Sequence, residues 1–356
     1  MRELFKSTAD RLFGDLVTPA LLESTRHGDW PGAFWESVEA AGFSTASAPE
    51  ALGGTGSPWN DLYVIVHAAG RYNVPAPLPE ALMANWLLGQ ARLECVAGPL
   101  SFAADSTLTM QNGRVTGKLA DVPFGRHVTH VVAMLSQGGS SSVVLLRTDH
   151  AFALKKRLNI AGESRDDLLF SDAAPIAYAA LPQGMPADLL LLGGALLRSA
   201  QIAGALETVL EMTSRYATER SQFGRPISGF QAIQHQLAVL AEHAAAATVA
   251  AEAAFALSGD APAVLPIMSA KVVASEAASL AAGIAHAVHG AIGVTDEHAL
   301  HFTTQRLWSW RSEFGSPTFW AQRLGREVCK AGAAQFWPAM ARGEFGRGVA
   351  MEGAQP

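Results

Sequence analysis

The segment from Leu189 to about Arg220 constrains the fold more than any other part of this sequence. Its residues are apolar on almost every face of a helix, which predicts a helix enclosed by other helices rather than one lying on a surface. Gly193, Gly194 and Arg198 interrupt the longest apolar run, so we do not expect it to cross a membrane. The segment is therefore predicted to be the first helix of a bundle.

Three further helical patterns follow this segment. The second helix has apolar residues at spacings of three and four, namely Phe230, Ile233, Leu237 and Leu240. A third helix is predicted from about Pro266 to His289 and ends at Gly290. A fourth is predicted to begin at Thr295 as its N-cap, with one face formed by Leu300, Thr303, Leu307, Trp310 and Phe314. Four long helices predict a four-helix bundle.

The part of the chain before this bundle divides into a helical and a β-rich stretch. Asp29 as N-cap and Gly42 as terminator delimit one helix, and further helices are expected near residues 60–72 and 79–90. After Gly98 the sequence consists of short β-favouring runs, with Asn112-Gly113 between two of them as a type I′ hairpin turn. The fold is predicted to be mainly α with a middle β domain: an N-terminal helical domain (1–97), a small β barrel (98–187) and a C-terminal four-helix bundle (188–356).

Composition favours a protein that assembles with other chains. Of the 356 residues, 49% are hydrophobic and 16% are charged, so neighbouring helices or other subunits are expected to cover much of the helical surface. The net charge is −6 and there is no dense Lys/Arg stripe, so neither nucleic acid nor a membrane is an expected partner. The first residues include acidic side chains and no apolar signal-peptide core, which predicts a cytoplasmic protein.

Three stretches of the sequence resemble the acyl-CoA dehydrogenase family. YATERSQFGRPISGFQAIQHQLA (216–238) is similar to the family's Tyr-x-x-x-Arg-x-x-Phe-Gly-x-x-Ile-x-x-Phe-Gln-x-x-x-x-x-Leu pattern. AVHGAIGVTDEHALH (287–301) is similar to its His-Gly-Gly-x-Gly-Phe/Tyr-Thr-x-Glu segment, and ESVEAAGFSTASAPEALGGTGSPWNDL (36–62) to its N-terminal glycine-rich loop. The resemblance spans nearly the whole chain and implies an FAD-dependent enzyme that converts an acyl-CoA thioester to the trans-2-enoyl-CoA.

By this resemblance, the turn after the first bundle helix reaches the FAD of a neighbouring subunit. The residues expected to contact the cofactor are Arg220, Gln222, Phe223, Phe230, Gln231, His289, Gly290, Ala291 and Ser316. Arg220 and Gln222 would hold the pyrophosphate through charge-assisted hydrogen bonds, each worth about 1.5–3 kcal/mol. Two simpler roles remain open, namely an ion pair of Arg220 with Glu219 and a capping box of Ser228 with Gln231.

Residues 289–291 match the family segment that lies against the adenosine part of the cofactor. A small residue there lets the backbone approach the ligand closely. The chain departs from the family pattern at Ala287 and Ala291, where the family commonly has Gln and a second Gly. Gly290 could also be a plain helix C-cap.

Family members remove the α proton of the thioester with a carboxylate while hydride leaves the β carbon for the flavin. The matching text, RSEFGSP (311–317), has Phe314 at the position of that carboxylate and Glu313 one residue earlier. Gly194 occupies the other position at which the family places its base. We therefore expect Glu313 to be the base, with a pKa raised by burial beneath the thioester. The alternative is a solvated Glu313 that pairs with a nearby arginine such as Arg311.

The resemblance also implies partners. These are an acyl-CoA substrate, an electron-transfer flavoprotein or similar acceptor, and a homotetramer or a heterotetramer with a related subunit. The displaced carboxylate and the absence of the family's Thr-Glu-x-x-x-Gly-Ser-Asp sequence favour an alternative role, a non-catalytic partner subunit of a heterotetrameric acyl-CoA dehydrogenase. A related flavin oxidase or monooxygenase is a third possibility.

Histidine pairs at i,i+3 spacing raise the question of a metal. The pairs are His286 with His289 and His298 with His301. The sequence has no His-Glu-x-x-His signature, and the resemblance assigns these positions to helix ends. No metal site is therefore expected.

Overall fold

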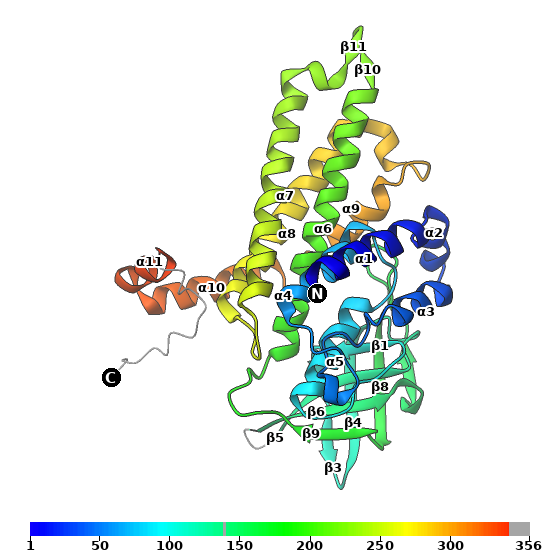
Figure 1. Cartoon of the computed structure of the whole chain (residues 1–356), viewed down its shortest axis with the longest axis vertical. Helices are drawn as coiled ribbons and strands as arrows, with labels where there is room; N and C mark the ends of the chain where they lie inside the picture. The colour runs from blue at the N-terminus through cyan, green and yellow to red at the C-terminus, as the bar shows by residue number, and fades with distance from the viewer. Residues whose placement is uncertain (138–139, 342–356) are drawn as a thin grey trace.

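The computed structural model describes residues 1–137 and 140–341, so the end of the predicted 188–356 segment lies outside the described residues. The helices before the first strand are α1 (Arg2–Leu16), α2 (Pro19–Arg26), α3 (Gly32–Ala40), α4 (Trp59–Arg71) and α5 (Leu78–Gln90). The helices predicted in this part are therefore confirmed (Figure 1). The N-cap of α3 is Pro31 rather than Asp29, so that detail of the prediction is wrong.

The middle of the chain forms two sheets. The strands are β1 (Leu100–Ala103), β2 (Asp105–Ser106), β3 (Thr109–Gln111), β4 (Arg114–Pro123), β5 (His130–Gln137), β6 (Ser140–Arg147), β7 (Ala153–Lys155), β8 (Arg165–Ala173) and β9 (Ala177–Ala180). One sheet has the order β1-β5-β6-β9 with β1 parallel to β5, and the other has the order β2-β4-β8-β7 with β3 paired to β4. Asn112 and Gly113 have φ values of 51° and 73°, which confirms the predicted hairpin turn.

The helices that follow the sheets form the predicted bundle. They are α6 (Leu189–Glu219), α7 (Gln231–Leu257), α8 (Val264–His289) and α9 (Leu300–Trp310), followed by α10 (Pro317–Ala331) and α11 (Ala333–Ala341). As predicted, α6 is enclosed: it packs against α4, α7, α8 and α9. A tight hairpin of β10 (Ser221–Gln222) and β11 (Arg225–Pro226) joins α6 to α7 at the far end of the bundle (Figure 1).

One apolar core connects the three parts of the chain. It includes Phe34, Leu62, Leu87, Phe102, Leu196 and Trp320. Because β1, α5 and α6 contribute to the same core, the first half of α6 and the turn after α9 lie against the sheets. The opposite half of α6 extends away from them, together with α7 and α8 (Figure 1).

One predicted helix start is wrong, and one alternative that the sequence left open is not formed. The fourth bundle helix begins at Leu300, because the chain first forms a 3-10 turn and the Thr295 hydroxyl donates to the Ile292 carbonyl instead of capping a helix. The second bundle helix, α7, begins at Gln231, and Ser228 lies in the 3-10 turn before it. No side chain caps α7 among the described contacts, so the predicted capping box is not formed.

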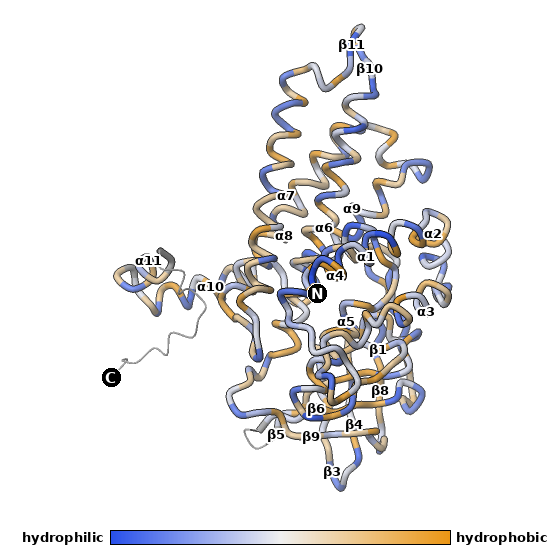
Figure 2. Tube along the Cα trace, viewed as in Figure 1, coloured by the Kyte–Doolittle hydropathy of each residue, from blue (hydrophilic) through white to orange (hydrophobic). Residues whose placement is uncertain are grey.

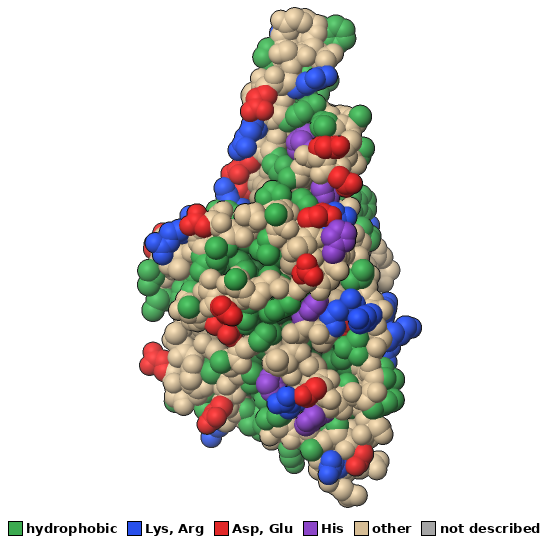
Figure 3. Space-filling view, turned by 90° about the vertical axis from the view of Figure 1, so that its right-hand side faces the viewer, with side chains coloured by type: hydrophobic (Ala, Val, Ile, Leu, Met, Phe, Trp, Pro, Cys, Tyr) green, Lys and Arg blue, Asp and Glu red, His purple; other side chains and the backbone are tan. Residues whose placement is uncertain are grey.

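The outer faces of α7 and α8 leave apolar residues uncovered. Within the described part of the chain, three helical stretches are long and apolar enough to cross a bilayer by length and composition: Leu189–Glu219, Gln231–Leu257 and Val264–Val294. The most apolar window of the first is 94% buried in the molecule, whereas those of the other two are 28% and 44% buried. Figure 2 shows hydrophobic residues along these helices, and Figure 3 shows charges of both signs interspersed with hydrophobic side chains on one face.

Candidate active site

The turn after α9 carries the predicted base. Phe314 and Gly315 have φ values of 53° and 98°, so the chain passes through the left-handed region at both residues before α10 begins. The Trp320 indole Nε1 donates to the Phe314 carbonyl at 2.9 Å and holds this conformation. Ser316, a predicted cofactor contact, is the N-cap of α10 and accepts from the Phe319 N–H at 3.1 Å. Its contact with a cofactor stays a prediction.

The Glu313 carboxylate accepts four hydrogen bonds from its own chain. Arg165, the first residue of β8, donates Nε to Oε1 and Nη2 to Oε2, both at 3.0 Å. Arg198 of α6 donates Nε to Oε2 at 2.8 Å, and Asn159 donates Nδ2 to Oε1 at 2.8 Å. Both guanidiniums are buried, and the Glu313 side chain is 15% exposed. Glu313 therefore pairs with two arginines distant in sequence rather than with a neighbouring one.

These arginines hold the pKa of the Glu313 carboxyl well below its usual range. Burial by itself raises this pKa, but the charges of Arg165 and Arg198 stabilise the ionised form more strongly. The prediction that burial would raise the pKa of Glu313 is therefore wrong. A carboxylate that binds a proton so weakly is a poor general base near neutral pH. These contacts favour an ion-pair role for Glu313, and its catalytic role stays a prediction.

Glu313 belongs to a larger network of buried charges. Its carboxylates and guanidiniums are those of Glu80, Glu163, Glu313, Arg165, Arg198 and Arg306. Arg198 pairs with Glu80 at an N···O distance of 2.7 Å. Glu163 pairs with Arg165 at 2.8 Å and with Arg306 at 3.0 Å. These ion pairs link α5, α6, β8 and α9. Sequence reasoning missed this network. The available signal was Arg198, a charged residue inside an otherwise apolar helix.

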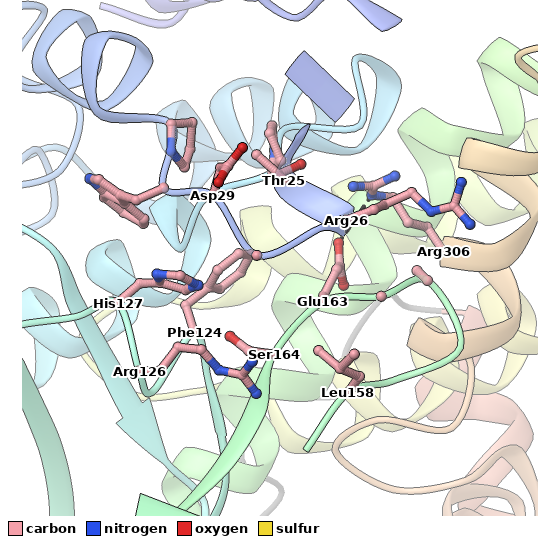
Figure 4. Close-up of a pocket in the computed structure, with 16 residues that line it drawn as sticks. Thr25, Arg26, Asp29, Phe124, Arg126, His127, Leu158, Glu163, Ser164 and Arg306 are labelled. Atoms are coloured by element: carbon pink, nitrogen blue, oxygen red, sulfur yellow. Dashed lines mark hydrogen bonds and ion pairs between the residues drawn. The ribbon is translucent and has the colours of Figure 1, made fainter. Parts of the chain in front are cut away.

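The crevice beside Glu163 is too small for a substrate. Figure 4 shows Glu163 and Arg306 there, together with Arg26 at the end of α2 and Asp29 from the α2–α3 connection. The free space is about 20 Å³, room for about one water molecule. The Ser164 hydroxyl in this crevice has no hydrogen-bond partner among the described residues, so a single water is the occupant that fits.

A much larger cavity of about 710 Å³ lies beside Glu313 and Phe314. Its walls come from both the sheets and the bundle, and include Asp105, Asp121, Arg157, Asn159, Leu191 and Trp308. This volume lies within the usual range of small-molecule sites, and the lining combines apolar side chains with a few polar ones. The cavity is therefore large enough to hold a substrate beside Glu313.

The two positions at which the family places its base lie in contact here, and neither is a carboxylate. The Phe314 ring stacks on Phe102 of β1, with centroids 5.3 Å apart and planes at 28°, and the Arg198 guanidinium lies 5.2 Å from its centroid. A Cβ atom on Gly194 would lie only 2.2 Å from the Phe314 Cγ. Phe314 therefore fills the space that the missing side chain of Gly194 leaves.

This fit predicts that Gly194→Ala destabilises the protein. Overpacking of this kind typically costs about 1–3 kcal/mol of unfolding free energy, measurable by urea denaturation. Gly283→Ala on α8 is the matched control, because no described atom outside its chain neighbours and the adjacent backbone of its own helix lies within 4 Å of the added Cβ. It should be neutral or stabilising by about 0.5–1 kcal/mol. The Phe314→Ala change should remove the added cost of Gly194→Ala, and equal stabilities of Gly194→Ala and wild type would contradict this packing.

The structure brings the predicted residues 220–231 together at the exposed tip of the bundle. Phe223 has φ 52° and is 92% exposed, and its ring meets only the edge of Phe230, 6.1 Å away, among the described ring contacts. The Arg225 guanidinium lies 4.2 Å from the centroid of Phe230. Arg220 forms no ion pair in the described part of the chain, so the alternative pairing with Glu219 is not seen. Within the described residues, the tip therefore offers an arginine without an ion pair and a largely exposed aromatic ring.

The tip is far from the cavity of its own chain. Arg198, which contacts Glu313, lies on α6, and Arg220 is the C-cap of the same helix, 22 residues further on (220 − 198). At a rise of about 1.5 Å per residue, this separation is about 33 Å. Arg220 and Phe223 therefore cannot complete a site at Glu313 of the same chain, and a ligand that they bind must belong to another subunit or to the tip itself.

His289 lies near the tip end of the bundle and keeps one nitrogen unused. It is buried, stacks on Tyr216 with centroids 4.4 Å apart, and bonds the Ala285 carbonyl through Nδ1 at 2.8 Å. Its Nε2 is a buried atom with no partner among the described residues. Burial lowers the pKa of His289, so Nε2 is an acceptor without a donor. Gly290, with φ 64°, ends α8 as a C-cap, and the adjoining Ala291 is exposed.

Comparison with known proteins agrees with this architecture. The family model described as Acyl-CoA dehydrogenase, C-terminal domain, matches residues 189–311. Acyl-CoA dehydrogenase IpdE2 of Mycobacterium tuberculosis is 28% identical over 335 residues, which cover 92% of this chain and 97% of that protein.

Solved structures show the same fold over nearly the whole chain. The ChsE4–ChsE5 complex from Mycobacterium tuberculosis matches with a TM-score of 0.80 at 21% identity, covering 93% of this chain and 98% of that chain. Butyryl-CoA dehydrogenase from Megasphaera elsdenii matches with a TM-score of 0.79 at 17% identity, and the match covers 92% of this chain and 97% of that chain. The predicted fold class is thereby confirmed. Residues 189–311 match the C-terminal domain of the acyl-CoA dehydrogenase family of oxidoreductases, and nearly the whole chain is similar to members of that family.

Proposed function

We propose that this chain is a subunit of an FAD-dependent acyl-CoA dehydrogenase that assembles with a related, base-bearing subunit and converts an acyl-CoA thioester to the trans-2-enoyl-CoA. The observation that carries the proposal is the contact between Phe314 and Gly194. Neither position that could supply a base has a proton acceptor, since one is Gly194 and the other is Phe314, and the adjacent Glu313 is engaged by Arg165 and Arg198. The carboxylate that removes the α proton must then come from another chain.

The residues at the tip fit a dinucleotide held by a neighbouring subunit. Arg220 and Gln222 would bind its pyrophosphate, since both are exposed and the guanidinium has no ion-pair partner in the described structure. Phe223 would pack beside the flavin, and the unused Nε2 of His289 provides an acceptor at the same end of the bundle. When bound, FAD supplies the acceptor for the hydride that leaves the β carbon of the thioester.

The uncovered faces of α7 and α8 support an assembly of several chains. Only 28% and 44% of the residues in their apolar windows are buried in the single chain, and burial of such surface is a main driving force for association. The similar structure of the ChsE4–ChsE5 complex supports a heteromeric rather than a homomeric assembly. An electron-transfer flavoprotein or a similar acceptor would reoxidise the cofactor.

The cavity of about 710 Å³ favours a second candidate, a homomeric enzyme with Glu313 as its base. In this case substrate binding would have to displace at least one guanidinium from the carboxylate. The loss of that contact would raise the pKa of Glu313 toward the range that a general base needs.

Purification of the full chain, alone and co-expressed with a related chain that has a carboxylate at the counterpart of Phe314, separates the candidates. The proposal expects a colourless protein alone and a yellow complex whose flavin absorbance is bleached by acyl-CoA. A yellow protein that forms from this chain alone and is bleached by acyl-CoA would overturn it in favour of the second candidate. A panel of acyl-CoA thioesters of different chain length and ring content would then define the substrate.

A further inference from the structure

Lys271 is a fully buried lysine in the bundle, beside the end of α9. It lies on α8, and its side chain has no exposure to solvent. Its Nζ donates to the Trp310 carbonyl at 2.9 Å, to the Arg311 carbonyl at 2.9 Å and to the Ser275 hydroxyl at 3.2 Å. Three donors of an ammonium group thus have three acceptors, which is the pairing that a buried lysine requires.

The two carbonyls belong to the end of α9. The last carbonyls of a helix have no partner within the helix, and a cation is favourable at this end of the helix dipole. Ser275 also donates to the Arg311 carbonyl, at 3.1 Å, so α8 holds the end of α9 through two side chains. The chain then enters the turn that contains Glu313 and Phe314.

We propose that Lys271 is a positioning residue for the turn Ser312–Gly315, because its side-chain nitrogen binds the two carbonyls from which this turn departs. The direction of the chain at Arg311 decides whether Glu313 meets the arginines of the network and whether Phe314 enters the space beside Gly194. Lys271 therefore sets one wall of the cavity without touching its contents. The inference concerns the same site as the proposed function, but it is tested on the turn itself.

The charges around Lys271 make the opening equilibrium of this turn depend on pH. Burial lowers the pKa of Lys271 from 10.5 to about 7; the charge of Glu313 opposes this shift, and those of Arg198 and Arg311 add to it. An opened turn that exposes Lys271 to water holds its proton up to the ordinary value of 10.5. Between about 7 and 10.5 the opened form therefore binds more protons than the closed form, so the closed turn becomes more favourable as pH rises. The expected change is about tenfold in the opening equilibrium per pH unit.

Hydrogen exchange of the full chain, read by mass spectrometry on peptides covering residues 310–316, tests this. The amides of Ser312 and Glu313 donate to the Ser309 carbonyl and report the closed turn. After correction for the intrinsic exchange rate, wild type should gain protection by about tenfold per pH unit above about pH 7. Lys271→Met should lose about tenfold to thirtyfold in protection, since two carbonyls lose their partner, and should show no pH slope of this kind.

Two controls make the test decisive. Lys330→Met removes an exposed lysine and should leave protection and slope unchanged. Ser275→Ala removes one of the three contacts and should lower protection by a smaller factor while keeping the slope. Wild-type protection and slope in Lys271→Met would overturn the inference. If Lys271→Met fails to fold by circular dichroism, unchanged protection in Ser275→Ala would overturn it instead. Neither readout requires flavin or a second subunit, so the inference and the proposed function can fail separately.

Discussion

Replacement of Glu313 by glutamine is expected to lower the free energy of unfolding by about 3–5 kcal/mol, because two buried guanidiniums lose the charge that compensates them. The side chain of Glu313 has almost the same shape as glutamine, so the effect comes from charge rather than from volume. Arg165 would keep Glu163 as a partner and Arg198 would keep Glu80, which places the expected loss in this range rather than above it. Denaturation by urea, followed by circular dichroism, measures it.

The pH dependence of the same quantity has a defined sign. The folded-state pKa of Glu313 lies below its ordinary value of 4.5, so its contribution to stability is present above about pH 4.5 and is lost as pH falls below it. Glu327→Gln is the control, because Glu327 forms only an exposed pair with Lys330, at 2.8 Å, which is worth little. Equal stabilities of Glu313→Gln and wild type would show that the network is not what joins the sheets to the bundle.

The Glu313→Gln variant also separates the two candidate functions. In a flavin-containing complex it should still be bleached by acyl-CoA if the base comes from the related subunit. Loss of bleaching, with the fold and the flavin content retained, would assign the base to Glu313. For the Glu313→Gln variant, urea denaturation therefore measures stability, and bleaching of the flavin independently measures reduction by acyl-CoA.

Replacement of Arg220 by alanine is expected to weaken FAD binding by the assembled enzyme by about 10-fold to 150-fold. This range corresponds to the loss of one charge-assisted hydrogen bond of about 1.5–3 kcal/mol. The unfolding free energy of the chain itself should stay within about 0.5 kcal/mol of wild type, since Arg220 is exposed and forms no ion pair in the described structure. Equilibrium dialysis of the complex against FAD measures the first quantity.

Arg215→Ala provides the matched control for this prediction. Arg215 is an exposed arginine on the same helix, five residues before Arg220 (220 − 215), and should not affect FAD binding. Equal losses in both variants would indicate a general electrostatic effect of the tip. Unchanged FAD affinity in Arg220→Ala would remove the tip from the cofactor site.

The elements that were predicted correctly have local causes. The apolar pattern of Leu189–Glu219 identified an enclosed helix, and Asn112-Gly113 identified a hairpin, because both signals lie within a few turns or a few residues of chain. The ends of helices were less predictable. Thr295 is a good N-cap residue, but the backbone before it closes a 3-10 turn, and its hydroxyl bonds there instead.

The candidate site was predicted in part. The adjacency of Gly194 and Phe314 agrees with the resemblance that placed both at base positions. The state of Glu313 was predicted wrongly, since burial was considered without the charges that would accompany it. Lys271 was not singled out, because a single lysine in a helical pattern carries no local sign that it will be enclosed.

The sequence by itself determined the order of a helical part, a β-rich part and a helical bundle, the position of the turn with Arg220 and Phe223 between the first two bundle helices, and the lack of a carboxylate at positions 194 and 314. These depend on residue identity and on periodicity along one segment. Only the tertiary structure decided the charge state of Glu313, because its partners Arg198 and Arg165 are 115 and 148 residues away in sequence. A pKa depends on which charges lie within a few ångströms in space, and packing of α6 against β8 and the turn after α9 brings those charges together.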